Sequence, residues 1–339
     1  MTAPTPPTPE LTLFDEEEEE EQGAAGYQQP VALVECDGDT YRVSPQALAL
    51  LESLERPVAT VAVAGLYRTG KSFLMNRLLR NAAFRTSSAI SSCTKGIWLA
   101  VDAETGTLVL DTEGLGAVDT ASSDHDSKIF ALALLLSSEF LYNSTGKVDE
   151  VALGQLGLVL KFAQHILSAE QGGEAHDWSR TWLVRDFTLK LIHPTTGATM
   201  TASEYLEVAL LEGGHDEAKS STRETIKRLF RRRACVTAPR PADEDQLERL
   251  HELEDDALNP KFVAAVDTLR AVMRGAAPLR AGGREVTGPL FARLVQQYVE
   301  ALNRGAIPSV SGAWEMIVER DNRAAADAAV TAFERAAAA

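Results

Sequence analysis

Residues 65–72 read Gly-Leu-Tyr-Arg-Thr-Gly-Lys-Ser and fit the phosphate-loop pattern G-x-x-x-x-G-K-[ST]. The apolar run at 58–64 leads into this stretch and predicts a buried parallel strand. Residues 72–79 have helical spacing and good helix formers, so they predict a helix. A helix N-terminus offers unpaired N–H groups and a positive dipole end to a polyphosphate. Strand, glycine loop and helix in this order therefore predict a nucleotide-binding α/β domain.

The residues of the loop have distinct expected roles. Lys71 is expected to reach the β- and γ-phosphates, and the Ser72 hydroxyl to ligate Mg²⁺. An ordinary glycine turn is the alternative, and the flanking strand and helix argue against it. The residues of this stretch expected to contact the nucleotide are Gly65, Leu66, Tyr67, Arg68, Thr69, Gly70, Lys71, Ser72 and Phe73.

A second motif follows about forty residues later, where the predicted strand at 107–110 runs directly into Asp111-Thr112-Glu113-Gly114. Asp-x-x-G at the carboxyl end of a strand is where phosphate-binding proteins place a carboxylate facing Mg²⁺ and a glycine near the γ-phosphate. The pattern alone is common, but its distance from the phosphate loop makes it specific. We therefore expect Asp111 and Gly114 at the site. A small-molecule kinase shares the phosphate loop, and this switch-like motif argues against that class.

Composition restricts the partners and the compartment. The formal net charge is −16, and the acidic run at 15–21 supplies much of it, so no broad basic surface for nucleic acid is expected. The three cysteines, Cys36, Cys93 and Cys235, have no C-x-x-C spacing, which fits a reducing compartment. His125, between two aspartates, is expected at the surface. No apolar run can span a bilayer, and we expect a cytoplasmic protein, with peripheral membrane contact left open.

The order of predicted elements indicates the architecture. Residues 1–29 predict a disordered acidic tail. Residues 31–43 predict a hairpin, Ser44-Pro45 predicts a helix start, and strands alternate with helices as far as the strand at 181–184. We expect an α/β P-loop NTPase fold of three layers with a mainly parallel central sheet.

The second half of the chain is expected to be nearly all helical from Glu204 onward. This expectation interprets Arg231-Arg232-Arg233 as a solvated helix end, and the region 242–275 as two helices. The breaker cluster at 305–308 is the best domain boundary. It would separate a nucleotide-binding domain at 30–304 from residues 309–339, the first helix of an all-α domain.

The base is expected to be guanine, although the chain lacks the N/T-K-x-D tetrad of many GTP-binding proteins. Asp186 lies at the end of a predicted buried strand. Its carboxylate can accept from both N1–H and N2–H₂ of guanine, and adenine has no such donor pair. The alternative is an aspartate in an ordinary loop salt bridge.

Taken together, these motifs closely resemble those of the guanylate-binding proteins, large GTPases of the dynamin superfamily. The resemblance runs from about residue 31 to the end of the chain. It rests on the phosphate loop at 65–72, T-K-G-I-W at 94–98, D-T-E-G-L-G at 111–116, L-L-S-S-E-F-L-Y-N at 135–143 and Arg185-Asp186. Atlastins share the loop and the R-D pair, but their switch sequences are less alike.

The resemblance implies a role for each matching residue. Ser72 and Thr94 would ligate Mg²⁺ directly. Asp111 would support the metal site indirectly, without being a direct ligand. Arg185 and Asp186 would recognise guanine. Ser92 and Glu113 would orient the attacking water, and the alternatives for them are a loop hydroxyl and a surface carboxylate.

Arg68 matches the family's internal arginine finger, which moves onto the phosphates when two GTPase domains meet. A planar cation fits the charge of a transferring phosphoryl group. From the residues alone, a solvated loop arginine is equally compatible.

The resemblance implies hydrolysis of GTP to GDP and phosphate, with Mg²⁺, in a nucleotide-dependent homodimer, and it leaves GMP open as a further product. Three stretches depart from the family. Leu183-Val184 replaces Thr-Leu before the R-D pair, Cys93 stands where a histidine is frequent, and the guanine-cap segment carries acidic residues at 243–245. The last departure weakens the expected dimer contacts. A nucleotide-gated scaffold with little turnover and an atlastin-like membrane-remodelling GTPase are the alternatives.

Overall fold

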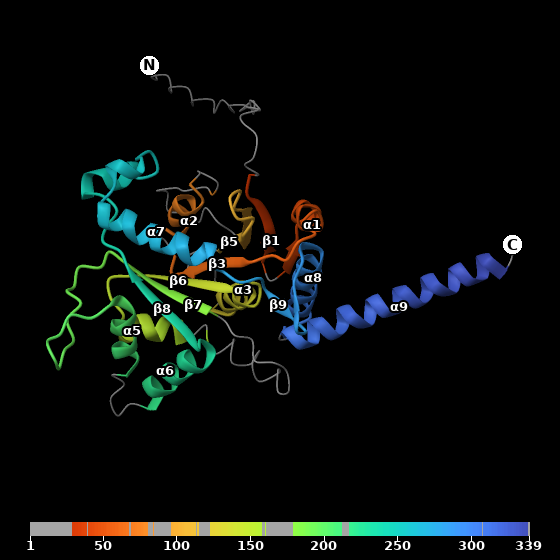
Figure 1. Ribbon diagram of the computed structural model, residues 1–339. Coiled ribbons are helices and arrows are strands. Elements are labelled where there is room, and N and C mark those ends of the chain that lie inside the picture. The colour runs from red at the N-terminus through yellow and green to blue at the C-terminus, as the bar shows by residue number, and fades with distance from the viewer. Residues whose placement is uncertain are drawn as a thin grey trace, which may run out of the picture.

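The computed structural model describes residues 29–38, 40–67, 69–80, 84, 96–112, 114, 123–157, 160, 179–211, 217–306 and 308–337. The acidic tail predicted at 1–29 lies outside this part of the chain except for its last residue. Figure 1 shows a body of strands and helices from which one long C-terminal helix extends.

A central sheet of eight strands organises the described residues, in the order β2-β1-β4-β5-β3-β6-β7-β8. The neighbours β5, β3, β6, β7 and β8 are parallel, whereas β4 runs antiparallel to β5 and to β1. The mainly parallel sheet predicted from the sequence is confirmed. The strands are β1 (Val31–Asp37), β2 (Thr40–Val43), β3 (Thr60–Gly65), β4 (Ile97–Val101), β5 (Leu108–Thr112), β6 (Glu139–Thr145), β7 (Ser179–Arg185) and β8 (Arg232–Thr237).

Each central strand is buried on both faces because successive side chains point to opposite sides of the sheet. On β3, Val61 and Val63 enter one core, while Ala62 and Ala64 enter the other. The unbroken apolar run at 58–64 is what a strand covered on both faces requires. The phosphate loop therefore begins at the carboxyl end of a strand in the middle of the sheet.

Helices cover both faces of this sheet and complete the three layers. In Figure 1, α2 and α7 lie above strands β3 and β6, and α5 and α6 lie below them. The helices of one face are α2 (Lys71–Leu79) and α7 (Pro260–Arg274). Those packed into the other core are α1 (Pro45–Glu52), α3 (Ser123–Leu135), α5 (Ala202–Leu211), α6 (Glu217–Leu229) and α8 (Gly288–Asn303).

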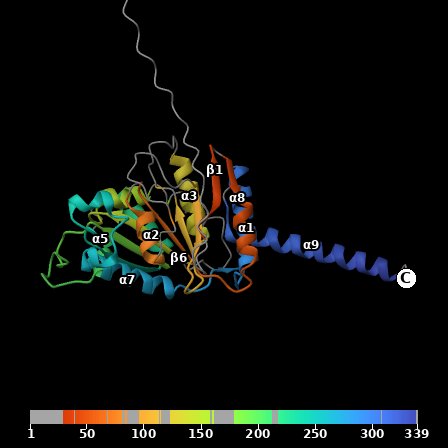
Figure 2. The ribbon, with the colours of Figure 1, turned by 90° about the horizontal axis from the view of Figure 1, so that it is seen from above.

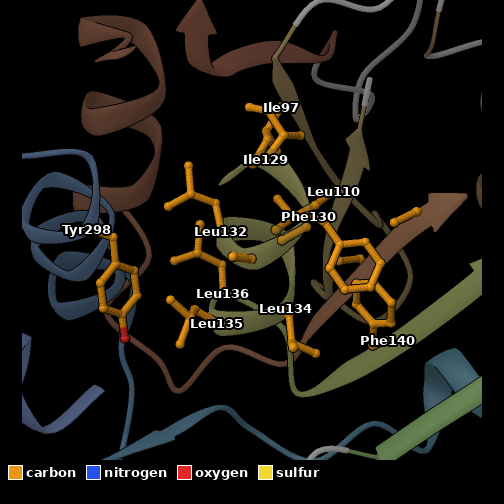
Figure 3. Packing of buried hydrophobic residues seen from close by; sticks show 14 of the residues in the cluster. Ile97, Leu110, Ile129, Phe130, Leu132, Leu134, Leu135, Leu136, Phe140 and Tyr298 are labelled. Atoms are coloured by element: carbon orange, nitrogen blue, oxygen red, sulfur yellow. The ribbon is translucent and has the colours of Figure 1, made fainter. Parts of the chain in front are cut away.

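Helix α3 is buried between the sheet and α8. All side chains from Ile129 to Leu136 are at most 2% exposed, so this apolar run is core and not surface. Figure 3 shows Tyr298 of α8 facing the leucines of α3, with Phe130 on the opposite side next to Phe140 of β6. The Phe130 and Phe140 rings meet edge to face with centroids 5.0 Å apart, a favourable aromatic geometry.

Helix α8 packs against α1 and β2, and α9 (Val310–Ala337) packs against α8 only near its start. Beyond Ile317 the described side chains of α9 are exposed, and the helix projects from the body (Figures 1 and 2). Among the described residues, no helix is long and apolar enough to cross a membrane.

The expectation that the chain is nearly all helical after Glu204 is wrong in three places. Arg232 and Arg233 begin β8 instead of ending a helix, and a small hairpin, β9 (Arg280–Ala281) with β10 (Arg284–Glu285), precedes α8. In the region 242–275 only α7 is an α-helix, and two short 3₁₀ turns, η1 (Glu244–Arg249) and η2 (Asp255–Ala257), precede it. Strand β8 was missed because it is a short edge strand whose arginines obscure the apolar pattern.

His125 is buried instead of exposed, which corrects its expected surface position. The Tyr41 hydroxyl and His125 Nδ1 are 3.0 Å apart, and the two rings are stacked. The main chain of Tyr41 exchanges hydrogen bonds of 2.9 and 2.8 Å with the side-chain amide of Asn303. These contacts join the start of α3, the edge strand β2 and the end of α8.

Candidate functional site

The phosphate loop connects β3 to α2 as the sequence predicts. Gly70 is the N-cap of α2, with a left-handed φ of +73° that favours glycine. Its carbonyl accepts the helical hydrogen bond from the Leu74 amide at 3.0 Å. Because the helix begins here, its first amide groups lack partners within the helix and lie at the loop. The local geometry is that of an anion site at a helix N-terminus.

Lys71, expected to bind phosphate, is buried at the base of this loop. Its ammonium group donates to the Leu66 carbonyl at 3.1 Å and to the Gly65 carbonyl at 3.4 Å. The Thr69 hydroxyl donates to the same Leu66 carbonyl at 2.8 Å. These bonds hold the loop closed around the lysine side chain. Main-chain carbonyls are neutral acceptors, so an anionic phosphate can replace them as the partner of the ammonium group.

Ser72 and Asp111 are brought together by the pairing of β3 with β5. The parallel register places Asp111 beside Val63, so the end of β5 lies next to the start of the loop. The Ser72 hydroxyl donates to Asp111 Oδ2 at 2.6 Å, and Asp111 is fully buried. Hydroxyl and carboxylate oxygens are ligands that Mg²⁺ prefers, so this pair fits the predicted metal site. Within the described residues, no group of three or more His, Cys, Asp or Glu side chains forms a separate metal site.

Gly114 also lies against the phosphate loop. A Cβ atom at this position would come within 2.4 Å of Tyr67 Cα and 2.9 Å of Lys71 Nζ. Only glycine fits where the two segments come this close. The D-x-x-G segment therefore packs against the phosphate loop. The two motifs lie in contact, and a shared nucleotide site stays a prediction.

Arg185 ends β7 and its side chain lies beneath the loop. Arg185 Nη1 donates to the carbonyls of Thr69 and Gly70, both at 3.0 Å. Its guanidinium carbon lies 6.0 Å from the ring centre of Phe73 and 5.6 Å from that of Phe262. Burial lowers the pKa of Arg185, and the charge of Asp186 opposes this shift. The predicted phosphate-loop residue Phe73 thus has its side chain in the core, beside this arginine.

Asp186 follows directly with a left-handed φ of +54°, which is uncommon for a residue other than glycine. This turn ends β7 and leaves Asp186 partly exposed. The R-D pair therefore has one buried and one accessible member. Recognition of guanine by either residue stays a prediction.

Asn143 is a site residue that the sequence reasoning did not select. It lies near the carboxyl end of β6, the strand beside β3, and its side-chain amide donates to the Thr69 carbonyl at 3.1 Å and to the Thr69 hydroxyl at 2.7 Å. It is fully buried. The available signal was a polar residue at the carboxyl end of a buried parallel strand, the edge where such sheets bind ligands.

The comparison with known families agrees with this geometry. The N-terminal domain of guanylate-binding proteins matches residues 38–274, more than half of the chain. The chain belongs to the guanylate-binding protein family. The C-terminal domain of the same family matches residues 282–338, from the hairpin before α8 onward.

Individual guanylate-binding proteins are similar over most of this chain. Human guanylate-binding protein 2 is 35% identical over 328 residues, and human guanylate-binding protein 4 is 37% identical over 329 residues. Both alignments cover 90% of this chain, and they cover 55% and 51% of the two relatives. The chain thus spans about half the length of these guanylate-binding proteins.

One solved structure shows a more distant likeness. A crystal structure of Aquifex aeolicus Era bound to GDP and AlF4⁻ matches with a TM-score of 0.34 at 14% identity. The match covers 72% of this chain and 65% of that chain. A likeness at this score carries no argument about the fold or the activity.

Several residues with roles implied by the guanylate-binding protein motifs lie outside the described residues. They are Arg68, Ser92, Thr94 and Glu113. The predicted finger, the water-orienting pair and one metal ligand therefore stay predictions. Cys93, the departure from the family beside Thr94, lies outside as well.

The segment after Pro241, which the resemblance assigns to the guanine cap, is anchored to the phosphate-loop helix. Arg77, in the last turn of α2, donates to Asp255 at 3.2 Å and to the Leu253 carbonyl. The main-chain carbonyl of Arg77 in turn accepts from Arg270 Nε of α7 at 3.2 Å. The cap segment and the loop are thus attached to opposite ends of one short helix. The acidic residues at 243–245 are exposed.

Proposed function

We propose that this guanylate-binding protein binds GTP with Mg²⁺ and hydrolyses it to GDP and phosphate. We further propose that a nucleotide-dependent homodimer of the GTPase domains accelerates the reaction. The observation that supports this most directly is the convergence of three groups. They are the buried Lys71 ammonium group, the Ser72–Asp111 hydrogen bond of 2.6 Å and Gly114 packed on the loop. A phosphate-binding loop, a metal-binding pair and a switch glycine are the components that phosphoryl transfer requires.

The loop holds the phosphates in this proposal. Amide groups at the start of α2 donate to phosphate oxygens, and Lys71 exchanges its two carbonyl partners for the β- and γ-phosphates. Lys71 is only 7% exposed, so its charge acts in a partly dehydrated environment. Electrostatic stabilisation of this kind is a large contribution to catalysis.

Ser72 and Thr94 would hold the metal, and the hydrogen bond from Ser72 to Asp111 would orient the Ser72 hydroxyl. When bound, Mg²⁺ neutralises the charge that develops on the β- and γ-phosphate oxygens. The hydrogen bond between Ser72 and Asp111 aims the hydroxyl lone pairs before the metal arrives, because the hydroxyl proton is already donated to the carboxylate.

Water attacks the γ-phosphorus in line with the bridging oxygen. The new P–O bond forms on the water oxygen, the bond to the bridging oxygen breaks, and GDP leaves with that electron pair. The protons of the water pass to the phosphate product. Ser92 and Glu113 orient the water, Glu113 through a bridging water, and Arg68 moves onto the phosphates when two domains meet.

Guanine is recognised by Asp186 in this scheme. Its carboxylate, accessible at the end of β7, accepts from N1–H and N2–H₂ of guanine. Adenine offers no matching pair of donors, which accounts for the expected selectivity.

The domain division and the dimer surface complete the proposal. We assign residues 30–304 to the GTPase domain, because α8 packs against α1 and β2, and residues 309–339 to the first helix of the helical domain. The cap segment is the expected dimer surface, and its exposed acidic residues favour a weaker or salt-dependent homodimer. The free thiol of Cys235 fits a cytosolic setting.

Two other functions fit parts of the site. A nucleotide-gated scaffold would use the same loop to bind GTP with little turnover. A membrane-remodelling GTPase of the atlastin type would share the loop and the R-D pair, and it would float with liposomes. Onward hydrolysis to GMP is a further outcome that product analysis would detect.

The test is GTP turnover per molecule across a dilution series, with an Arg68→Ala variant and with Arg42→Ala, an exposed arginine on β2, as matched control. We expect specific activity to rise with protein concentration, to fall sharply in Arg68→Ala, and to be unchanged in Arg42→Ala. A slow turnover that does not depend on concentration, together with tight GTP binding, would favour the scaffold. Absence of GTP binding would overturn the proposed function as a whole.

A further inference from the structure

Two main-chain carbonyls of the phosphate loop are held from below by side chains of the neighbouring strands. The carbonyls of Thr69 and Gly70 each accept from Arg185 Nη1 at 3.0 Å. The Thr69 carbonyl also accepts from the Asn143 amide at 3.1 Å. Arg185 ends β7 and Asn143 lies near the carboxyl end of β6, so both donors come from buried strands of the core and not from the loop.

Because each peptide group is planar, these hydrogen bonds to the carbonyls also set the orientation of the loop N–H groups. In a trans peptide the C=O and the following N–H point in opposite directions, and no described peptide bond is cis. Holding the carbonyls of Thr69 and Gly70 toward Arg185 therefore turns the N–H groups of Gly70 and Lys71 away from it. That opposite side is where the loop faces its ligand at the N-terminus of α2.

We infer that Arg185 is a positioning residue for the phosphate-binding amides and does not contact the guanine base. The inference rests on the proposed function and deepens it, because it divides the R-D pair into two roles. Arg185 sets the loop amides for phosphate, and Asp186 alone recognises the base.

The packing of Arg185 supports this division. Arg185 is 6% exposed, and a Cβ on Gly70 would come within 2.4 Å of its Nη1. The guanidinium group thus fills the space directly under the loop, where Gly70 alone leaves room for it. The backbone then turns at Asp186, which has a left-handed φ. Asp186 is therefore partly exposed, whereas Arg185 is buried.

The electrostatics make this contact hard to break. Arg185 Nε is buried and has no hydrogen-bond partner in the described part of the chain. The two loop carbonyls, the rings of Phe73 and Phe262 and the charge of Asp186 are what offset the burial of the cation. A loop conformation that rotated these carbonyls away would leave a buried charge without hydrogen bonds, which is strongly unfavourable. The loop is therefore held in its phosphate-binding conformation before the nucleotide arrives.

The experiment compares Arg185→Lys with Asp186→Asn by measuring GDP, GTP and XTP affinity through calorimetry. Lysine keeps the charge but cannot place a rigid planar donor against both carbonyls. We expect Arg185→Lys to weaken GDP and GTP binding roughly tenfold or more while the ratio of GTP to XTP affinity stays at the wild-type value. We expect Asp186→Asn to lower that ratio, because an amide can donate to the C2 carbonyl of xanthine.

A second readout distinguishes positioning from a general loss of packing. In ¹⁵N-lysine-labelled protein, pyrophosphate should shift the Lys71 amide resonance in the wild type and much less in Arg185→Lys. The Lys227 amide, in the last turn of α6 on the other face of the sheet, is the internal reference and should not differ. Thermal unfolding of each variant verifies that it is folded.

Asn143→Ala is the second variant and decides the question if Arg185→Lys does not fold. It removes one of the two donors to the Thr69 carbonyl, so weaker GDP binding at an unchanged GTP-to-XTP ratio is expected. An Arg185→Lys variant with wild-type GDP affinity, or with a GTP-to-XTP ratio changed as in Asp186→Asn, would overturn the inference. A wild-type protein that bound no GTP would overturn the proposed function instead, so the two failures are distinct.

Discussion

Arg180 and Arg185 lie at opposite ends of β7, and their guanidinium groups enter opposite cores of the molecule. Arg185 is hydrogen-bonded to the phosphate loop, next to Phe73 and Phe262. Arg180 lies among Tyr142, Trp182 and Phe230, with its guanidinium carbon 4.4 to 4.9 Å from the three ring centres. Within the described part of the chain, none of its three nitrogens has a hydrogen-bond partner. One strand thus carries two buried cations, and only one of them is bonded to the site.

Replacing Arg180 by Met should be neutral or should stabilise the fold by up to about 2 kcal/mol at pH 7, because an apolar side chain avoids the cost of burying a charge. Burial lowers the pKa of Arg180 to about 9, which indicates that the charged form is disfavoured there. Urea unfolding measures the difference. Arg233→Met is the matched control, because Arg233 lies beside Arg180 on β8 and has a carboxylate partner, Glu207, at 2.9 Å. A loss above about 2 kcal/mol in Arg180→Met would show that the three rings hold the cation favourably.

Ser72→Ala should lower GTP turnover by about a hundredfold or more at saturating Mg²⁺ while leaving the fold intact. The Ser72 hydroxyl is the proposed metal ligand, and Asp111, its acceptor at 2.6 Å, would lose the group that it orients. Ser53→Ala is the control, since the Ser53 hydroxyl is exposed and donates only to the Leu50 carbonyl. Turnover in Ser72→Ala equal to that of the control would remove Ser72 from the metal site.

The stability of the wild type relative to Glu139→Gln should fall as the pH rises. Burial raises the pKa of Glu139 above its ordinary value of 4.5, and hydrogen bonds from Ser179 and Thr181 and the charge of Arg232 oppose this shift in part. A carboxyl whose pKa is raised on folding stabilises the fold below its unfolded pKa, and this contribution is lost as the pH rises through the folded value. Denaturant unfolding from below pH 4.5 to neutral pH measures the trend.

Glu52→Gln is the control for this pH series, because Glu52 is exposed on α1. A free-energy difference between wild type and Glu139→Gln that is constant with pH, or that grows in favour of the wild type, contradicts the prediction. The assigned cause, burial at the start of β6, would then be wrong.

Asn303→Ala should destabilise the fold by about 1–3 kcal/mol, because two main-chain groups of the edge strand β2 lose their partners. The Asn303 amide pairs with both the N–H and the C=O of Tyr41, at 2.9 and 2.8 Å, much as a neighbouring strand would. Thermal and urea unfolding measure the effect. Asn322→Ala, on the exposed part of α9, should change stability by less than about 0.5 kcal/mol. Equal stabilities for the two variants would mean that water replaces the amide at β2.

Much of the fold could be predicted from local patterns. The hairpin at 31–43, the helix after Ser44-Pro45, the strand before the phosphate loop and the helix after it are confirmed, because turn residues and unbroken apolar runs are local signals. Strand β8 could not be predicted, since Arg232 and Arg233 are tolerated only at the sheet edge, and that position is a property of the whole sheet. The same reason applies to His125, whose burial depends on Tyr41, 84 residues away in the chain.

The site divides in the same way. The sequence by itself determined the phosphate loop, the D-T-E-G segment and the R-D pair, because the spacing of glycine, lysine and carboxylate follows from the chemistry of phosphate and metal. Only the tertiary structure decided which groups meet. The register of β3 with β5 brings Asp111 to Ser72, and the ends of β6 and β7 bring Asn143 and Arg185 under Thr69. Such contacts depend on strand pairing across distant parts of the chain, and no local pattern specifies them.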